Sequence, residues 1–234
     1  YTMKLHRFFV DKGAVQEKKI NLTDVKAISQ IKKVLRLGVG DPVVFLDNTG
    51  KEYFCRIVES HVGSLISDVE TVKENVNEPE LKIALYQSLC KKDKFEWVLQ
   101  KGTEIGVSAF IPIVAERSEK LGFDAERARK IIKEAAEQSK RGRLPYLLDV
   151  ADFETAMKDT LGEKLVLDAS GGRISEHTFI IKTEIGLFVG PEGGWSEREL
   201  EIARAAGAKI VSLGNRLLRT ETAGVVATAV ILNS

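Results

Sequence analysis

Two segments with apolar runs, residues 164–167 (apolar after Lys164) and residues 185–189, constrain the fold of this 234-residue chain more than any other feature. Each has about the length of one strand, and a run without polar alternation is typical of a parallel strand that is buried on both faces. Such a strand needs a covering layer on each side, and helix-like segments lie between the apolar runs. The second half of the chain is therefore expected to form an open α/β sheet with helices on both faces.

The segments after residue 79 alternate regularly between strand and helix patterns. Strands are predicted at residues 81–89, 109–114, 164–167, 185–189 and 209–213. Helices are predicted at residues 93–106, 124–140, 196–207 and 221–232. Asp93 with Glu96 and Ser196 with Glu199 have the spacing of capping boxes, and Gly106 is a stop signal.

The first 72 residues have a different texture, in which short strand-like runs dominate. These runs are separated by turn signals and lie at residues 42–46, 53–58 and 64–69. One helix is predicted over residues 23–37, with Thr23 as its N-cap. Its apolar face consists of Ile28, Ile31 and Leu35.

We therefore predict two domains joined by a linker. Residues 1–72 are expected to form a small β-barrel, and residues 80–234 the α/β domain. The segment between them, residues 73–79, is polar and ends in a proline, which is typical of a linker.

Composition excludes several classes of protein. Lys and Arg together number 35 against 34 for Asp and Glu, so the net charge of +1 does not by itself indicate a nucleic-acid partner. Cys55 and Cys90 have neither zinc-ligand spacing nor the density of a disulfide scaffold, and a reducing compartment is expected. No apolar run approaches the roughly 20 residues that span a membrane, and no signal-peptide pattern is present at the start. We expect a cytoplasmic protein without a membrane partner.

Common catalytic motifs are missing from the sequence. It has no GxGxxG after the first strand, no GxxxxGK[ST], no HExxH and no GxSxG. A dinucleotide site, a P-loop, zinc proteolysis and α/β-hydrolase chemistry therefore have no support, and no metal site is expected.

A buried strand leads directly into three glycines and a capped helix at residues 189–196. Glycine lets the backbone approach a ligand closely, and the start of the helix supplies free N–H groups. This segment is either a ligand-binding loop or a tight strand-to-helix turn.

Residues 213–223 follow the last predicted strand, and Arg219 and Glu221 lie here between apolar runs. Burying such a pair is costly without a partner or a function, although Thr220 or Thr222 also suits a helix cap. Residues 165–172 form a third strand followed by small residues. Since ligands of open α/β sheets bind at the carboxyl ends of the strands, the three segments together favour a binding site.

Basic residues occur beside aromatic ones near the start of the chain and in a cluster near residue 140. Arg7 precedes Phe8 and Phe9, and Lys140, Arg141 and Arg143 have no acid between them. Cations and aromatic rings suit single-stranded RNA, whose phosphates and bases they contact. A solvated helix end and a first strand that buries its phenylalanines explain the same residues equally well.

These segments resemble the RsmE-type 16S rRNA (uracil-N3) methyltransferases of the SPOUT class. The two specific motifs are residues 190–196 (GPEGGWS) and 213–223 (LGNRLLRTETA). Further family motifs match at residues 6–9 (HRFF), 34–36 (VLR), 100–107 (QKGTEIGV), 112, 116–118 (ERS), 134–141 (EAAEQSKR) and 145. The resemblance covers nearly the whole chain. It departs at Lys32 and Lys33, near which many members have a histidine, so no role of a histidine is expected there.

The resemblance implies a fold, a cofactor and partners. The fold would be a SPOUT-type α/β trefoil-knot methyltransferase domain preceded by a PUA-like β-barrel that helps to bind RNA. S-adenosylmethionine would be the cofactor, bound among the three strand-end loops. The substrate would be 16S rRNA of the small ribosomal subunit, methylated at N3 of a uridine. The enzyme would work as a homodimer with the knot region at the interface.

The resemblance also assigns site residues. Arg219 would stabilise the uracil anion, and Glu221 would orient Arg219 or accept the proton. The cofactor would be bound by Leu167, Val189, Gly190, Pro191, Glu192, Gly193, Leu213, Gly214, Leu217, Leu218, Arg219, Thr222 and Ala223. RNA phosphates would be contacted by Arg7, Arg36, Arg141 and Arg143.

Three alternatives remain open at this point. The first is an RNA-binding or ribosome-assembly protein without catalysis. The second is a phosphate-binding α/β enzyme that uses residues 190–196 as an anion cradle. The third is a SPOUT enzyme that acts on tRNA or on another rRNA nucleotide.

Overall fold

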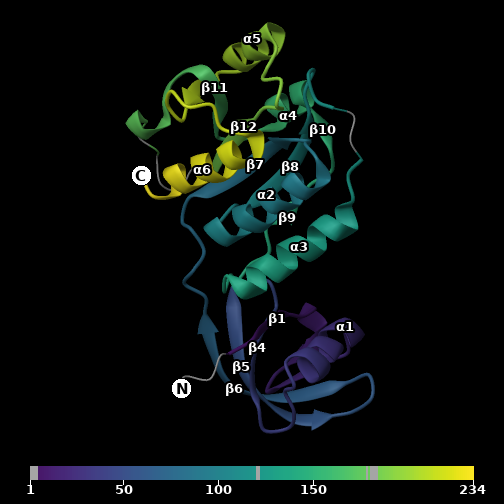
Figure 1. The fold of residues 1–234 in the computed structure, drawn as a ribbon. Coiled ribbons are helices and arrows are strands. Elements are labelled where there is room, and N and C mark those ends of the chain that lie inside the picture. The colour runs from purple at the N-terminus through teal and green to yellow at the C-terminus, as the bar shows by residue number, and fades with distance from the viewer. Residues whose placement is uncertain (1–4, 120–121, 178, 180–183) are drawn as a thin grey trace. The chain divides into compact units, whose positions relative to one another are not determined.

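The computed structural model describes residues 5–119, 122–177, 179 and 184–234 (Figure 1). The chain forms two compact units that are not continuous in sequence. Unit 1 comprises residues 1–78 and 136–144, and unit 2 comprises residues 79–135 and 145–234. No helix in the described part of the chain is long and apolar enough to cross a membrane.

Unit 1 is built on one six-stranded sheet, with the strand order β1-β4-β5-β6-β3-β2. The strands are β1 (Arg7–Phe9), β2 (Val15–Gln16), β3 (Lys19–Leu22), β4 (Pro42–Leu46), β5 (Lys51–Ser60) and β6 (Leu65–Glu74). All neighbours are antiparallel except β1 and β4. Within the described residues the end strands β1 and β2 do not pair with each other, so the sheet is a curled, open half-barrel.

A short helix covers the core of unit 1. It consists of α1 (Val25–Ser29) and a π-helical turn, η2 (Gln30–Val34). Ile28 and Ile31 are buried, as the apolar spacing predicts. The prediction of Thr23 as N-cap is wrong by one residue, because the Asp24 carboxylate accepts the first-turn hydrogen bonds. Ile28 and Ile31 pack with the large apolar side chains of the sheet, among them Phe8, Ile20, Leu22, Val43, Phe45, Ile57 and Leu65.

Residues 136–144 complete unit 1 through a buried ion pair. The Arg141 guanidinium lies 2.8 Å from a Glu78 carboxylate oxygen, and the two side chains are only 4% and 14% exposed. The same carboxylate accepts from the N–H groups of Gly142 and Arg143. Burial alone would raise the pKa of Glu78, but the hydrogen bonds and charge of Arg141 outweigh it, and the pKa is lowered. The sequence analysis assumes that each domain is a continuous segment, and so it does not predict this pairing of residues 63 positions apart.

Unit 2 contains the predicted parallel sheet. Its main order is β10-β8-β7-β12-β11-β13, and β9 also pairs with β8. The strands are β7 (Lys82–Ser88), β8 (Ala109–Val114), β9 (Tyr146–Leu147), β10 (Ala151–Asp152), β11 (Glu163–Arg173), β12 (Glu184–Val189) and β13 (Lys209–Ser212). All their pairings are parallel, so their carboxyl ends lie along one edge.

Helices cover both faces of this sheet, as predicted. The helices are α2 (Lys92–Ile105), α3 (Ala125–Gln138), α4 (Phe153–Asp159), α5 (Glu197–Ala205) and α6 (Thr220–Leu232). Ile83 and Leu85 pack with α2, α3 and α6, whereas Ala84 and Tyr86 pack with α4 and α5. Successive residues of β7 thus enter opposite cores, which explains why the strand is apolar throughout.

Local signals at helix ends are partly confirmed. Ser196 and Glu199 form the predicted capping box of α5, and Gly106 ends α2 with a φ of 112°. The capping box predicted for Asp93 and Glu96 is wrong, because α2 begins one residue earlier and Lys91 is its N-cap. The Glu96 carboxylate instead binds Arg127 of α3. The predicted strand at residues 164–167 is longer than expected, since β11 continues with a register shift to Arg173.

The buried pair in unit 1 predicts a pH-dependent stability. Replacing Glu78 by Gln removes the carboxylate from the buried ion pair with Arg141, which should lower the free energy of unfolding by roughly 3 kcal/mol at neutral pH. Because folding lowers the pKa of Glu78, its contribution is complete at neutral pH and is lost as the pH falls through the folded-state pKa. Urea unfolding at a series of pH values should therefore show that the free energies of unfolding of wild type and variant converge in acid. The exposed Glu80→Gln variant should match wild type throughout.

Candidate active site

Three segments that the sequence singles out meet at the carboxyl edge of the unit 2 sheet: β11 at its register shift after Leu167, the turn after β12 and the segment after β13. The Thr220 hydroxyl, at the start of α6, donates to the carbonyl of Gly190, which follows β12. It accepts in turn from Gln87 Nε2 of β7, at 3.0 Å. Trp195 Nε1 donates to the Leu167 carbonyl of β11, also at 3.0 Å. Side chains thus connect all the strand ends that the sequence singles out.

The glycine-rich segment 190–196 is a packed turn. A Cβ on Gly190 would lie 3.0 Å from the buried ring of Trp195, and Gly194 has a φ of 68°. The Gly194 N–H donates to the Pro191 carbonyl at 2.9 Å, which closes the turn. Position 190 therefore requires glycine for lack of space beside Trp195, and position 194 favours glycine because of its positive φ.

Residues 116–118 hold this turn from outside. Arg117 donates to the carbonyls of Gly193 (3.1 Å) and Trp195 (3.2 Å). The Ser196 hydroxyl donates to Glu116, and the Glu116 N–H donates to Glu199. The sequence marks these residues only as a family motif, and the contacts lie about 80 positions apart, so no local signal reveals them.

The segment 213–219 presents several side chains to solvent. Gly214 has a φ of 96°, Leu217 is 96% exposed, and Arg219 is exposed. Arg219 is the N-cap residue of α6 but makes no side-chain cap. Capping by Thr220 therefore does not explain this segment, because that hydroxyl binds Gly190 instead.

Lys94 is a residue that the sequence analysis missed. Its ammonium on α2 lies 3.7 Å from Glu192 of the glycine-rich turn and 3.7 Å from Glu221 of α6. The other oxygen of Glu221 is buried and has no hydrogen-bond partner among the described residues, and the same holds for Gln87 Oε1. Glu221 thus pairs with Lys94, and no ion pair joins it to Arg219 in the described structure.

The sites expected for cofactor and for RNA belong to different units. The strand-end residues, Leu167, Val189–Gly193, Leu213, Gly214, Leu217–Arg219 and Glu221–Ala223, all belong to unit 2. The four arginines expected to contact phosphates belong to unit 1. Among the described residues, no group of three or more His, Cys, Asp or Glu could bind a metal ion.

The four arginines differ in their surroundings. Arg7 pairs with Glu52 at 3.1 Å and Arg141 with Glu78, and both side chains are largely buried. Arg36 is exposed and has a left-handed backbone, with a φ of 57°. Arg143 is exposed and donates to the Asn48 carbonyl.

Comparisons with known proteins agree with this architecture. A family model described as "RNA methyltransferase domain" matches residues 77–232, and one described as "RNA methyltransferase PUA domain" matches residues 22–67. The chain belongs to this RNA methyltransferase family. Ribosomal RNA small subunit methyltransferase E of Bacillus subtilis is 32% identical over 97% of this chain and 96% of the relative. The protein of that name from Synechocystis is also 32% identical, over 97% of this chain and 77% of the relative.

Solved structures give the same result. Ribosomal RNA small subunit methyltransferase E from Neisseria gonorrhoeae, bound to S-adenosyl methionine, has a TM-score of 0.90 and 28% identity, with 98% of each chain covered. A putative methyltransferase from Legionella pneumophila in complex with the same cofactor has a TM-score of 0.89 and 27% identity, covering 99% of this chain and 98% of the other. The resemblance and the fold class predicted from the sequence are confirmed.

The hydroxyl of Thr220 offers a direct test of how the strand-end loops are connected. Thr220→Val keeps the shape but leaves the Gly190 carbonyl without its donor and takes from Gln87 Nε2 its shorter hydrogen bond, so that only the Ser88 carbonyl at 3.5 Å remains as acceptor. The free energy of unfolding should fall by about 2 kcal/mol, and amide exchange in residues 190–196 should accelerate. Urea unfolding and hydrogen exchange measure the two effects. Thr222→Val, on the same helix, should change neither, and equal effects of the two variants would contradict this connection.

Proposed function

We propose that this protein transfers the methyl group of S-adenosylmethionine to N3 of a uridine in 16S rRNA of the small ribosomal subunit. The observation that carries the proposal is the convergence of β11 at its register shift with the segments that follow β12 and β13, in a chain of this family. The same cofactor and rRNA appear in the names of the most similar proteins described above.

The strand-end site suits this cofactor. At Gly214 no atom lies within 4 Å of the position that a Cβ would take, which leaves the backbone there open to an adenine or a ribose. We assign cofactor binding to the residues that the resemblance indicates: Leu167, Val189, Gly190, Pro191, Glu192, Gly193, Leu213, Gly214, Leu217, Leu218, Arg219, Thr222 and Ala223. When bound, the cofactor supplies an electrophilic methyl group on a sulfonium.

The residues of this chain would align the acceptor and manage its proton. Methyl transfer forms a bond from N3 to carbon, leaves the electron pair of the broken C–S bond on sulfur, and releases the N3 proton. The exposed guanidinium of Arg219 stabilises the developing uracil anion. Glu221 accepts the proton, and Lys94 keeps this carboxylate in place. Of the two roles that the resemblance implied for Glu221, orienting Arg219 or accepting the proton, we assign the second, because Glu221 pairs with Lys94.

RNA binding is assigned to unit 1. The expected domains, residues 1–72 and 80–234 with residues 73–79 between them, would have the roles of RNA binding and methyl transfer, and residues 136–144 join the RNA-binding domain because they belong to unit 1. Arg36 and Arg143 contact phosphates, since their guanidinium groups are exposed. Arg7 and Arg141 support the same surface indirectly, because each is committed to a carboxylate. The protein functions in the cytoplasm, where ribosomal subunits are its partners.

A homodimer through the knot region is supported by the composition of α6. Its residues are apolar or small except at Glu221 and the threonines. Ala227 and Ile231 face the core of unit 2, whereas Val226, on another side, is 36% exposed. A helix that is apolar around its circumference needs a covering partner on each side, and a second copy supplies it.

The first experiment is transfer of a labelled methyl group to small ribosomal subunits from cells lacking this enzyme, followed by nucleoside analysis. Label in 3-methyluridine is expected. Arg219→Ala should lower turnover about 100-fold while the cofactor Kd, measured by calorimetry, changes little, because Arg219 would contact the cofactor through its backbone and its guanidinium acts on the transition state.

Several outcomes would contradict these assignments. Label in tRNA or in another nucleoside would identify a different substrate, and cofactor binding without transfer would indicate the non-catalytic alternative. Nucleotide binding without methyl transfer would favour the phosphate-binding enzyme. Equal losses of turnover and cofactor affinity in the arginine variant would remove Arg219 from its catalytic role.

The dimer has its own test. Val226→Glu puts a charge into the proposed interface, so sedimentation velocity should show a monomer where wild type sediments as a dimer. Val150→Glu replaces a valine of similar exposure (42%) outside α6 and should leave the dimer intact. A wild-type monomer, or an unaffected Val226 variant, would overturn this arrangement.

A further inference from the structure

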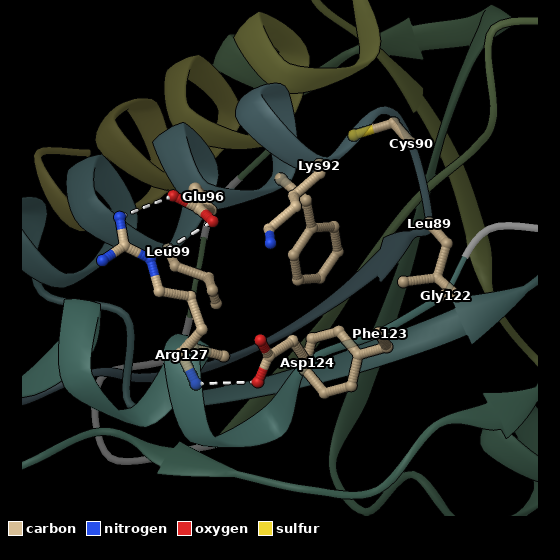
Figure 2. A pocket seen from close by; sticks show the side chains of 11 residues that line it. Leu89, Cys90, Lys92, Glu96, Leu99, Gly122, Phe123, Asp124 and Arg127 are labelled. Carbon is tan, nitrogen blue, oxygen red and sulfur yellow. Dashed lines mark hydrogen bonds and ion pairs between the residues drawn. The ribbon is translucent and has the colours of Figure 1, made fainter.

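A cavity of about 250 Å³ opens where β7 ends, between the first turns of α2 and α3. Figure 2 shows Leu89 and Cys90, which follow β7, Leu99 of α2, and Phe123, just before α3. Phe95 of α2 also lines the cavity. The mechanism described above uses none of these residues.

The lining combines an apolar interior with a charged rim. The rings of Phe95 and Phe123 stand edge to face, with centroids 5.6 Å apart. On the rim, the Arg127 guanidinium binds Glu96 through two nitrogen atoms, at 3.0 and 3.3 Å, and the backbone N–H of Arg127 donates to Asp124. Arg127 balances only one of these two carboxylates. The exposed Lys92 side chain, which has no ion pair in the described structure, is the second cation of the rim.

The start of α2 adds backbone donors at the same place. Lys91, the N-cap residue, makes no side-chain hydrogen bond to the first turn. The first N–H groups of a helix have no partner within the helix, and its positive dipole end favours an acceptor or a negative charge. The cavity therefore offers an aromatic wall together with donors suited to carbonyl oxygens.

The cavity lies on the same edge of the sheet as the proposed cofactor site. β7 is the direct neighbour of β12, and both strands run in the same direction. Phe95 lines the cavity, whereas the preceding residue, Lys94, reaches Glu192 and Glu221. Burial and the charges of these two carboxylates raise the pKa of Cys90, on the cavity wall, to about 12.

We propose that this cavity receives the uracil base that is methylated, after it has been turned out of the RNA stack. A planar ring with apolar faces and carbonyl oxygens at its edge matches the aromatic wall, the N–H groups of α2 and the Lys92 cation. The volume is below the roughly 300 Å³ at which pockets for drug-sized ligands begin, and it suits a single ring. The assignment rests on the proposed function. It adds the place of the uracil, which would lie beside the proposed cofactor site, with Lys94 between the two.

The test fills the cavity without removing a contact. Ala128 is buried on α3 and lines the cavity, and Ala128→Leu occupies part of its volume. The kcat/KM for unmodified small ribosomal subunits should fall about tenfold or more, while the cofactor Kd stays within about twofold of wild type. Ala125→Leu, in the same helix but outside the lining, should behave like wild type. Unchanged kinetics of the Ala128 variant would overturn the proposal, and a loss of cofactor affinity would assign the cavity to the cofactor instead.

A second pair of variants decides the question if Ala128→Leu does not fold. Phe123→Leu removes the ring and should lower kcat/KM about tenfold, mainly through KM. Phe123→Tyr keeps a stacking surface and should retain most of the wild-type kcat/KM. Equal activity of the two variants would overturn the assignment. If wild type methylates the subunits and the variants do as well, only the pocket is wrong. If wild type transfers no methyl group, the function proposed above fails first and the pocket assignment fails with it.

Discussion

The hydroxyl of Thr220 is the contact on which the strand-end site depends. One oxygen atom donates to the carbonyl that follows β12 and accepts from the amide of Gln87 on β7. A buried carbonyl or amide left without a partner costs more than the hydrogen bond itself contributes, so the segment before α6 is held against the glycine-rich turn. The positions of Arg219 and Glu221, on either side of Thr220, follow from this one constraint.

The sequence predicts best what short-range physics determines. The buried strands, the Ser196–Glu199 capping box and the end of α2 at Gly106 each depend on residues within one turn or one strand, and the structure contains them. The strand-end location of the site follows from a general rule about parallel sheets. The trefoil-knot class came only from the resemblance, because general rules of chain topology argue against knots.

Contacts between distant segments could not be predicted. Lys94 and Glu221 are 127 positions apart, and nothing near either residue indicates the pairing. Arg141 and Arg143 look alike in sequence, yet Arg141 is buried and Arg143 is exposed, because the guanidinium of Arg141 pairs with Glu78 whereas Arg143 reaches that carboxylate only through its backbone N–H. Glu96 is a further example, since the residue predicted for a capping box with Asp93 pairs instead with Arg127 of another helix.

The discontinuous composition of unit 1 limits how such a protein can be rearranged. Cutting the chain after residue 78 would remove residues 136–144 from the unit they complete, leaving Phe9 and Leu46 without Ala136 and Glu78 without Arg141. A single genetic crossover at that point could not exchange one half for an unrelated module without exposing an apolar patch and a stranded charge. The two units are therefore expected to be inherited together, and engineered chimaeras would need to carry both pieces of unit 1.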